Sequence, residues 1–254
     1  GGQNPDWHCD NNIGEPLFFN NEEFRAKTVL LWEKIAFHYK DNPWVGGYDL
    51  VNEPCYFDKS LDTVLLSFYE SCIQSIRKVD TNHLIFLEGN TYARDFSMFS
   101  DNPDDKVAYS FHYYPFLQLE KKPQTGDLKE LLKQSLYKDV TLTHLQNLGR
   151  PIWCGETGHP MHKIDHIKFL SVFIELLEEM NISWSLWPHK DARAMALWYL
   201  QKDSDYLQIT KQASRNWNFW DFFTQDSILS VKDSPDKFAF YKQLAKQSTV
   251  ASAL

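Results

Sequence analysis

The segment that decides the fold runs from Trp44 to Pro54 and reads WVGGYDLVNEP. Its apolar and aromatic part, residues 44–51, is typical of a buried β-strand. The polar pair Asn52 and Glu53 follows directly, at the point where the strand ends. The same order of buried strand, polar residue and amphipathic helix recurs along the chain. Because parallel strands need crossover helices between them, this alternation predicts an α/β fold with a parallel sheet.

The boundaries of the other elements follow from the same patterns. Asn20 and Glu23 form the pattern of a capping box, which predicts the start of a helix. We expect further strands at residues 83–87, 107–111, 151–154 and 182–187, and helices at 20–39, 61–78, 128–148, 164–180 and 235–246. The first helix is expected to carry on one face Phe24, Thr28, Leu31 and Ile35. No repeat or linker interrupts the chain, so we expect residues 1–254 to form a single domain.

The composition excludes several classes of protein. Of 254 residues, 43% are hydrophobic and 24% charged, which is typical of a soluble globular protein. A net charge of −8 argues against a nucleic acid partner. No apolar run reaches the roughly 18 residues of a membrane span, and no basic-then-apolar leader is present, so we expect neither a membrane partner nor a signal peptide. The aromatic content of 15% is a weak hint of a sugar-binding cleft, since core packing takes most aromatic residues.

No motif predicts a metal or an organic cofactor. No two cysteines have the C-x-x-C spacing of a thiolate metal site; they are Cys9, Cys55, Cys72 and Cys154. Three histidines could suggest metal ligands but lack an H-E-x-x-H context; they are His159, His162 and His166. The chain also lacks a glycine-rich phosphate loop. We therefore expect no cofactor and no metal.

Polar side chains follow each predicted strand directly. They are Glu53, Glu88, His112, Glu156 and the segment 188–191. In a parallel barrel these positions share the carboxyl-end face, where active sites are built. Two convergent carboxyl groups, Glu53 and Glu156, suit glycoside cleavage, with one as general acid and the other as nucleophile or base. The alternative is that each glutamate caps a following helix or pairs with an arginine.

Four strings in this order resemble glycoside hydrolase family 5, the cellulase family. They are WVGGYDLVNEP at residues 44–54, HYYP at 112–115, GETG at 155–158 and WSLW at 184–187. The resemblance extends from Gly1 to about Asp191. It implies a TIM (β/α)8-type barrel with glutamates after the fourth and seventh strands. It also implies a retaining double displacement, whose two carboxyl groups lie about 5–5.5 Å apart.

The resemblance assigns a role to each matching residue. Glu53 resembles the family's acid/base and Glu156 its nucleophile. Asn52 resembles the asparagine that binds the sugar 2-hydroxyl. Tyr114 matches a tyrosine that hydrogen-bonds the nucleophile, and Trp187 matches the tryptophan that floors the subsite beside the scissile bond. The expected substrate-binding set is Asn52, Glu88, His112, Tyr114, Trp187, His189 and Lys190, with a structural role as the alternative for Glu88.

The beginning of the sequence departs from the family pattern. Residues 1–4 look like the loop after the family's third strand, so we expect an incomplete barrel made of strands 4–8. An open barrel exposes strand edges and an apolar interior, and we therefore expect a homo-oligomer whose partner chains cover them. The alternative is that residues 188–234 fold back over the gap.

The leading hypothesis is a retaining β-glycoside hydrolase that acts on cellulose-type β-1,4-glucan or a related plant polysaccharide. This substrate class predicts an extracellular or periplasmic location. The alternative hypothesis is a catalytically impaired carbohydrate-binding remnant, because the family's arginine after strand 2 and histidine after strand 3 have no counterpart. The sequence leaves open the identity of the sugar and the choice between endo and exo action.

Overall fold

The computed structural model describes residues 17–100, 104–115, 127–158, 164–188, 190–191 and 198–199. The chain divides into two compact units. The first comprises residues 1–113, 133–156 and 180–184, and the second comprises residues 114–132, 157–179 and 185–254. The single domain expected over residues 1–254 stays a prediction.

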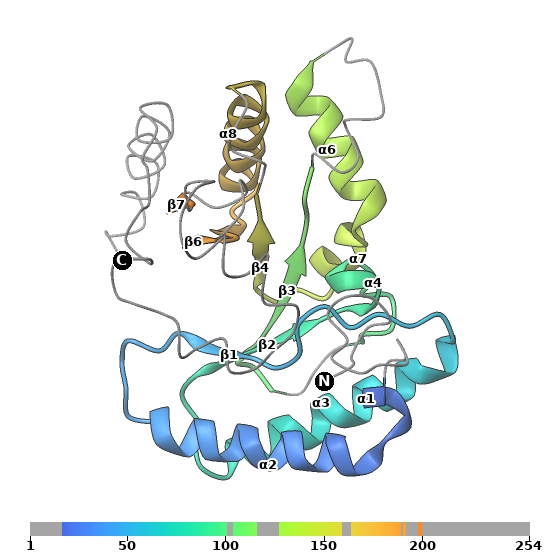
Figure 1. Cartoon of the computed structure of the whole chain (residues 1–254), viewed down its shortest axis with the longest axis vertical. Coiled ribbons are helices and arrows are strands. Elements are labelled where there is room, and N and C mark those ends of the chain that lie inside the picture. Colours follow the sequence, from blue (N-terminus) through green and yellow to red (C-terminus); the bar gives the residue numbers. More distant parts are fainter. Residues whose placement is uncertain are drawn as a thin grey trace, which may run out of the picture. The chain divides into compact units, whose positions relative to one another are not determined.

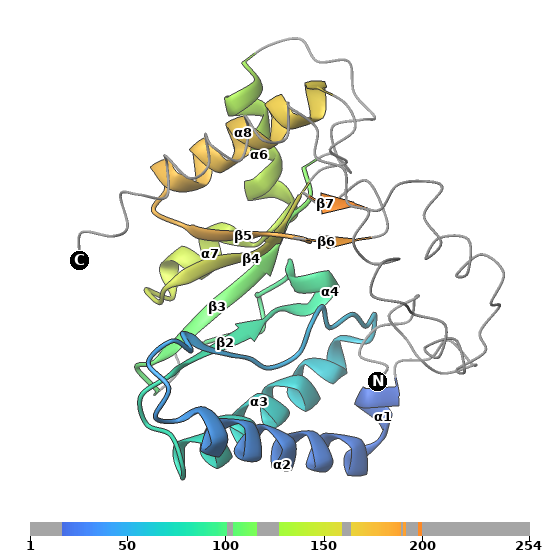
Figure 2. The same ribbon diagram turned by 60° about the vertical axis from the view of Figure 1, so that its left-hand side comes forward.

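A five-stranded sheet runs in the order β1-β2-β3-β4-β5 (Figures 1 and 2). Its strands are β1 (Gly47–Asp49), β2 (Leu84–Glu88), β3 (Val107–His112), β4 (Ile152–Thr157) and β5 (Ser183–Leu186). The pairs β1–β2, β2–β3 and β3–β4 are parallel, as the alternation of strands and helices predicts. Every predicted strand is present. The first is shorter than expected, because only three of its residues pair with a neighbour.

The helices follow the predicted order as well. They are α1 (Leu17–Asn20), α2 (Glu22–Tyr39), α3 (Asp62–Arg77), α4 (Asn90–Ala93), α6 (Leu128–Asp139), α7 (Leu142–Asn147) and α8 (Ile164–Glu179). A 3-10 turn, η1 (Lys59–Leu61), precedes α3, and the short strands β6 (Lys190–Asp191) and β7 (Trp198–Tyr199) pair in parallel. The helix expected at residues 235–246 lies outside the described residues. Among the described residues, no helix is both long and apolar enough to cross a membrane.

The single helix predicted over residues 128–148 is wrong, because the structure breaks it between α6 and α7. The break lies at Thr141, whose backbone N–H donates to Arg94 O at 3.0 Å. The Thr141 hydroxyl accepts from the Phe96 backbone N–H at 2.7 Å. These long-range bonds to the loop after β2 replace the local bonds that a continuous helix would need.

Two details predicted for the first long helix also differ. Asn20 ends α1, and the N-cap of α2 is Asn21, whose side chain accepts from the Phe24 backbone N–H at 3.1 Å. The residues predicted to share one face of this helix are only partly covered, since Phe24 is 39% and Leu31 55% exposed. The face that packs on the sheet instead contains Ala36, which is fully buried, and Trp32.

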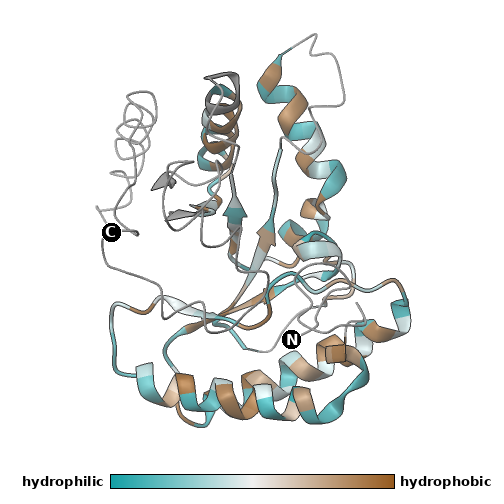
Figure 3. Cartoon of the chain, viewed as in Figure 1, coloured by the Kyte–Doolittle hydropathy of each residue, from teal (hydrophilic) through white to brown (hydrophobic). Residues whose placement is uncertain are grey.

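One face of the sheet packs against α2 and α3, which lie side by side (Figures 1 and 2). Tyr48 of β1 packs on Trp32 of α2, and Tyr109 of β3 packs on Phe99, which stacks on Tyr69 of α3. Figure 3 shows apolar stretches along β2, β3 and α3. Because successive strand residues point to opposite faces, the residues that follow Tyr48 and Tyr109 lie on the other face of the sheet.

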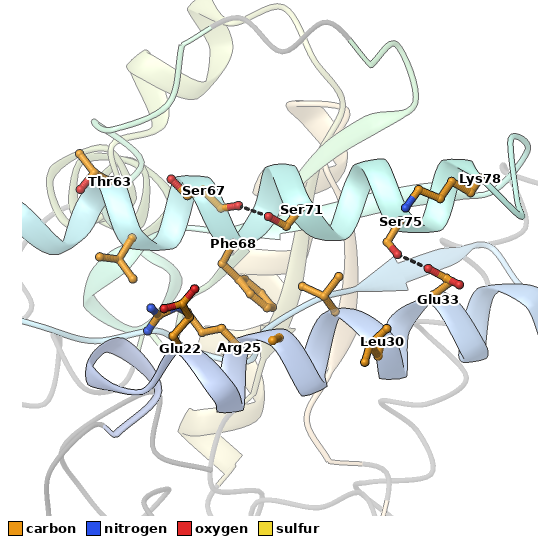
Figure 4. A pocket seen from close by; sticks show the side chains of 13 residues that line it. Glu22, Arg25, Leu30, Glu33, Thr63, Ser67, Phe68, Ser71, Ser75 and Lys78 are labelled. Carbon is orange, nitrogen blue, oxygen red and sulfur yellow. Dashed lines mark hydrogen bonds between the residues drawn. The ribbon is translucent and has the colours of Figure 1, made fainter.

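A groove of about 740 Å³ lies between α2 and α3 (Figure 4). Phe68 lines it from α3, and Leu30 lines it from α2. The Ser75 hydroxyl donates to the Glu33 carboxylate across the groove. None of the site residues predicted from the sequence lines this groove.

Candidate active site

Four polar side chains come together at the carboxyl ends of the first unit's strands. Glu88 is the last residue of β2, His112 is the last of β3, and Glu156 lies near the end of β4. Glu53 follows β1 by four residues. The pairing of β3 with β4 brings His112 and Glu156 together. The register of this pairing shifts by one residue between Phe111 and His112, and the shift places His112 opposite Glu156.

His112 is the centre of this cluster and contacts three carboxylates. Its Nδ1 atom lies 3.0 Å from Glu53 Oε1 and 3.5 Å from Glu156 Oε2. Its Nε2 atom lies 3.2 Å from Glu88 Oε1. Oxygens of Glu53 and Glu156 and one His112 ring nitrogen all lie within 4.8 Å of one another. The structure therefore joins two glutamates that are distant in the sequence through one imidazole.

The charge of the cluster favours an ionised imidazole. Burial by itself would lower the pKa of His112. The negative charges and hydrogen bonds of Glu88 and Glu53, together with the charge of Glu156, outweigh burial and raise the pKa well above its usual value. An imidazolium donates from both nitrogens, so His112 donates towards Glu53 and Glu88 at the same time.

Glu88 supports the backbone of Glu53 as well as the imidazole. Glu53 has a φ of 50°, a left-handed conformation that is uncommon for a residue with a side chain. Its backbone N–H donates to Glu88 Oε2 at 2.6 Å. Such backbone conformations cost about 1–3 kcal/mol and persist where surrounding contacts hold them. Glu88, which is 2% exposed, is one of these contacts.

Gly155 allows β4 to approach β3 beside the cluster. A Cβ atom at this position would overlap Ser110 Oγ and would lie 3.3 Å from His112 Nε2. Only glycine therefore leaves His112 and the serine in place. Sequence reasoning missed this requirement, although a glycine between the strand predicted at residues 151–154 and Glu156 was its signal.

Asp49 is a second residue that sequence reasoning missed. It ends β1, and alternation along the strand places it on the face opposite Tyr48, the face that also carries Glu88 and His112. Its signal in the sequence was a carboxyl group inside an otherwise apolar strand.

The donor set of Glu53, His112 and Glu156 is one that a divalent cation could use. A metal-binding imidazole must be neutral, however, and the three surrounding carboxylates favour its protonated form. The predicted absence of a metal and of a cofactor stays a prediction. His159 and His162 lie outside the described residues, and His166 belongs to α8.

The remaining predicted site residues are placed as follows. Asn52 is exposed on the loop beside Glu53. Tyr114 and Trp187 belong to the second unit, where Tyr114 is half-buried and Trp187 is 39% exposed. The Trp187 backbone N–H donates to Thr157 O at 2.8 Å. His189 lies outside the described residues, and Lys190 begins β6.

The fold and the cluster define an α/β protein with a carboxylate-rich site at the carboxyl ends of a parallel sheet. Solved structures share this fold. Endoglucanase Cel5A from Thermotoga maritima matches with a TM-score of 0.60 and 21% identity, covering 76% of this chain and 65% of that chain. The predicted fold class, an incomplete TIM-type barrel of five parallel strands with helices, is confirmed.

A family model described as cellulase (glycosyl hydrolase family 5) matches residues 5–193. The chain therefore belongs to glycosyl hydrolase family 5, as the sequence motifs predict.

Curated relatives of this chain carry several activities in their names. A β-xylosidase from Phanerodontia chrysosporium is 29% identical over 82% of this chain and 47% of its own length. Endoglucanase A from Evansella cellulosilytica is 28% identical over 76% of this chain and 36% of its own. An endoglycoceramidase from Cyanea nozakii is 35% identical over 68% of this chain and 35% of its own. The chain thus spans less than half the length of these three relatives.

Proposed function

We propose that this chain is a retaining β-glycoside hydrolase that cleaves β-1,4-glucan or a related plant polysaccharide. The observation that carries the proposal is the meeting of Glu53 and Glu156 at His112. Membership of glycosyl hydrolase family 5 supports it. The names of the relatives, among them endoglucanases, a cellodextrinase and a β-xylosidase, favour a β-linked polysaccharide or oligosaccharide as substrate.

In the proposed reaction, Glu156 attacks the anomeric carbon while protonated Glu53 gives its proton to the leaving oxygen. The resulting glycosyl ester on Glu156 is then attacked by water, which Glu53 deprotonates. Retaining enzymes hold their two carboxyl groups about 5–5.5 Å apart, whereas inverting enzymes need about 6.5–9.5 Å. Oxygens of Glu53 and Glu156 within 4.8 Å of each other support the retaining course.

The imidazole of His112 serves both steps in this scheme. Its Nδ1–H donates to Glu53 Oε1, which leaves the other oxygen of Glu53 to carry the transferred proton. The same positive charge lies 3.5 Å from Glu156 and stabilises its ionised, nucleophilic form.

The other site residues are assigned to substrate binding. Asn52 would hold the sugar 2-hydroxyl, Tyr114 would hydrogen-bond the nucleophile, and Trp187 would carry a sugar ring on its exposed face. We include Glu88, His189 and Lys190 in the same substrate-binding set. The substrate class places the reaction outside the cell or in the periplasm.

The test is reducing-sugar release from carboxymethylcellulose, other β-glucans, mannan and xylan. We expect release by the wild type and none by Glu156→Ala, with Glu70→Ala on the exposed side of α3 as the matched control. Proton NMR of the first product should show the β-anomer. Release by neither protein from any substrate would favour a catalytically impaired carbohydrate-binding remnant.

A further inference from the structure

Asp49 lies next to the cluster and has no part in the reaction proposed above. It pairs with Phe86 on β2, two residues before Glu88 on the same strand. Alternation along both strands puts the side chains of Asp49 and Glu88 on one face of the sheet. Ser110 of β3, which is paired with Glu88, lies on this face too.

One oxygen of the Asp49 carboxyl group lacks a hydrogen-bond partner among the described residues. This atom, Oδ1, is buried. A buried polar atom without a partner costs about 1–3 kcal/mol, so such atoms need an explanation. The neighbouring carboxylate of Glu88 cannot supply a hydrogen, since an ionised carboxylate only accepts.

The oxygens of Glu88 are both committed as acceptors. Oε1 faces His112 Nε2 at 3.2 Å, and Oε2 accepts from the Glu53 backbone N–H at 2.6 Å. In this arrangement both oxygens of Glu88 accept hydrogen bonds. A negative charge on Asp49 would repel the negative charge of Glu88, whereas a proton on Asp49 would remove the repulsion and supply the missing hydrogen.

We propose that Asp49 holds a proton in the resting protein and donates a hydrogen bond to Glu88, acting as a positioning residue for Glu53 and His112. Through Glu88, this bond fixes the left-handed backbone of Glu53 and the orientation of the imidazole. The proton stays on Asp49 throughout the reaction. The catalytic consequence rests on the proposed function, but the protonation of Asp49 does not.

The electrostatic surroundings agree with this assignment. Burial, followed by the negative charge of Glu88, raises the pKa of Asp49 well above its ordinary value of 3.8. The charge of His112 and the hydroxyl of Ser110 act in the opposite direction and do not cancel these effects.

Two substitutions test whether the carboxyl group of Asp49 is protonated or ionised. Asp49→Asn keeps the size and a hydrogen donor, so it imitates the protonated acid. Asp49→Leu removes the donor. We expect kcat to fall about 10²-fold in Asp49→Leu with KM nearly unchanged, because displacement of a catalytic group by about 1 Å has an effect of this size. Asp49→Asn should recover most of that loss, and exposed Asp105→Asn is the control.

Infrared spectroscopy tests the proton without activity. We expect a protonated-carboxyl C=O band at pH 7 in the wild type, with one component missing from the Asp49→Asn spectrum. A wild type without hydrolytic activity would refute the proposed function, and the infrared result would then decide the protonation of Asp49 alone. Identical carboxyl bands in both proteins, or a loss of kcat in Asp49→Asn as large as in Asp49→Leu, would overturn the proposal.

Discussion

His112 of β3 links three side chains that come from β2, from β4 and from the loop after β1. It is 4% exposed and lies between Glu53, Glu88 and Glu156. An imidazolium in this position offsets part of the repulsion between the ionised carboxylates around it. The substitution of any one of these residues therefore changes the surroundings of the others, and the effects of two substitutions in the cluster should not be additive.

The first prediction concerns Glu53 as general acid. Glu53→Gln removes the transferable proton, and general acid–base catalysis contributes about 10²–10⁴-fold. We expect kcat on a β-glucan to fall by this factor. The loss should be much smaller on an aryl glycoside whose leaving group departs without protonation. Equal losses on both substrates would contradict the assignment of Glu53.

The second prediction concerns Gly155. The methyl group of Gly155→Ala would overlap Ser110 Oγ, and overpacking of this kind costs about 1–3 kcal/mol. We expect a lower denaturation midpoint and lower activity, because His112 must also move. Adding Ser110→Ala should restore part of the free energy of unfolding. A single Gly155→Ala variant as stable as the wild type would disprove the close approach of β4 to β3.

At the scale of the secondary-structure elements, the sequence does not decide which residue caps the start of α2. Two asparagines stand in sequence, and the pattern with Glu23 favours Asn20 as the cap. The short helix α1 occupies Asn20 in the structure, so Asn21 caps α2 instead.

The third prediction follows from this correction. Asn21→Ala should lower the free energy of unfolding by about 1 kcal/mol, the usual contribution of an asparagine N-cap. Asn20→Ala should have a smaller effect, since its side chain is exposed and does not cap α2. Urea denaturation of both variants is the measurement. A larger effect at Asn20 would restore the capping box predicted from the sequence.

A second cluster joins Tyr48 of β1 to residues just before the amino end of β2. Asp80 Oδ2 accepts from the Tyr48 hydroxyl at 2.6 Å and lies 2.6 Å from His83 Nδ1. Burial would raise the pKa of Asp80. Hydrogen bonds from Tyr48, Asn82 and His83 outweigh burial and lower the pKa from 3.8 to about 2. Residues at this end of a barrel serve stability.

The fourth prediction is the acid dependence of stability. A carboxyl group whose pKa is lower in the folded state stabilises the fold above its unfolded pKa, and this contribution disappears as the pH falls through the folded pKa. For Asp80 the window runs from 3.8 down to about 2. Asp80→Asn should be about 2 kcal/mol less stable than the wild type at pH 7. The difference should shrink below pH 4, while exposed Asp41→Asn shows none. A constant difference across this range would contradict the ionised state of Asp80.

At the scale of the whole molecule, several large apolar side chains of the described residues are exposed to solvent. On α2, Leu30 is 58%, Leu31 55% and Phe37 60% exposed. Among the described strands, β1 stands at the end of the sheet order with β2 as its one neighbour. Exposed apolar patches and strand edges of this kind are typical of surfaces that associate.

The fifth prediction is therefore self-association. We expect light scattering at micromolar concentration to show a homo-oligomer. Leu31→Glu and Phe37→Glu should shift it towards the monomer, whereas Lys138→Glu on the exposed side of α6 should not. A monodisperse wild-type monomer would disprove the predicted association.

Local pattern was enough to predict the order of strands and helices. Alternating apolar runs, helical periodicity and polar residues at strand ends are properties of neighbouring residues, and they place Glu53, Glu88, His112 and Glu156 at one end of a parallel sheet. The break at Thr141 was not predictable in this way, because its partners Arg94 and Phe96 are more than forty residues away.

The sequence alone therefore determined the fold class, the family and the residue types of the candidate site. Only the tertiary structure decided how these residues meet. The shift of register at His112, the space left by Gly155 and the position of Asp49 beside Glu88 are relations between strands. Such relations depend on pairing and on close packing across the sheet, and a local sequence pattern carries no information about either.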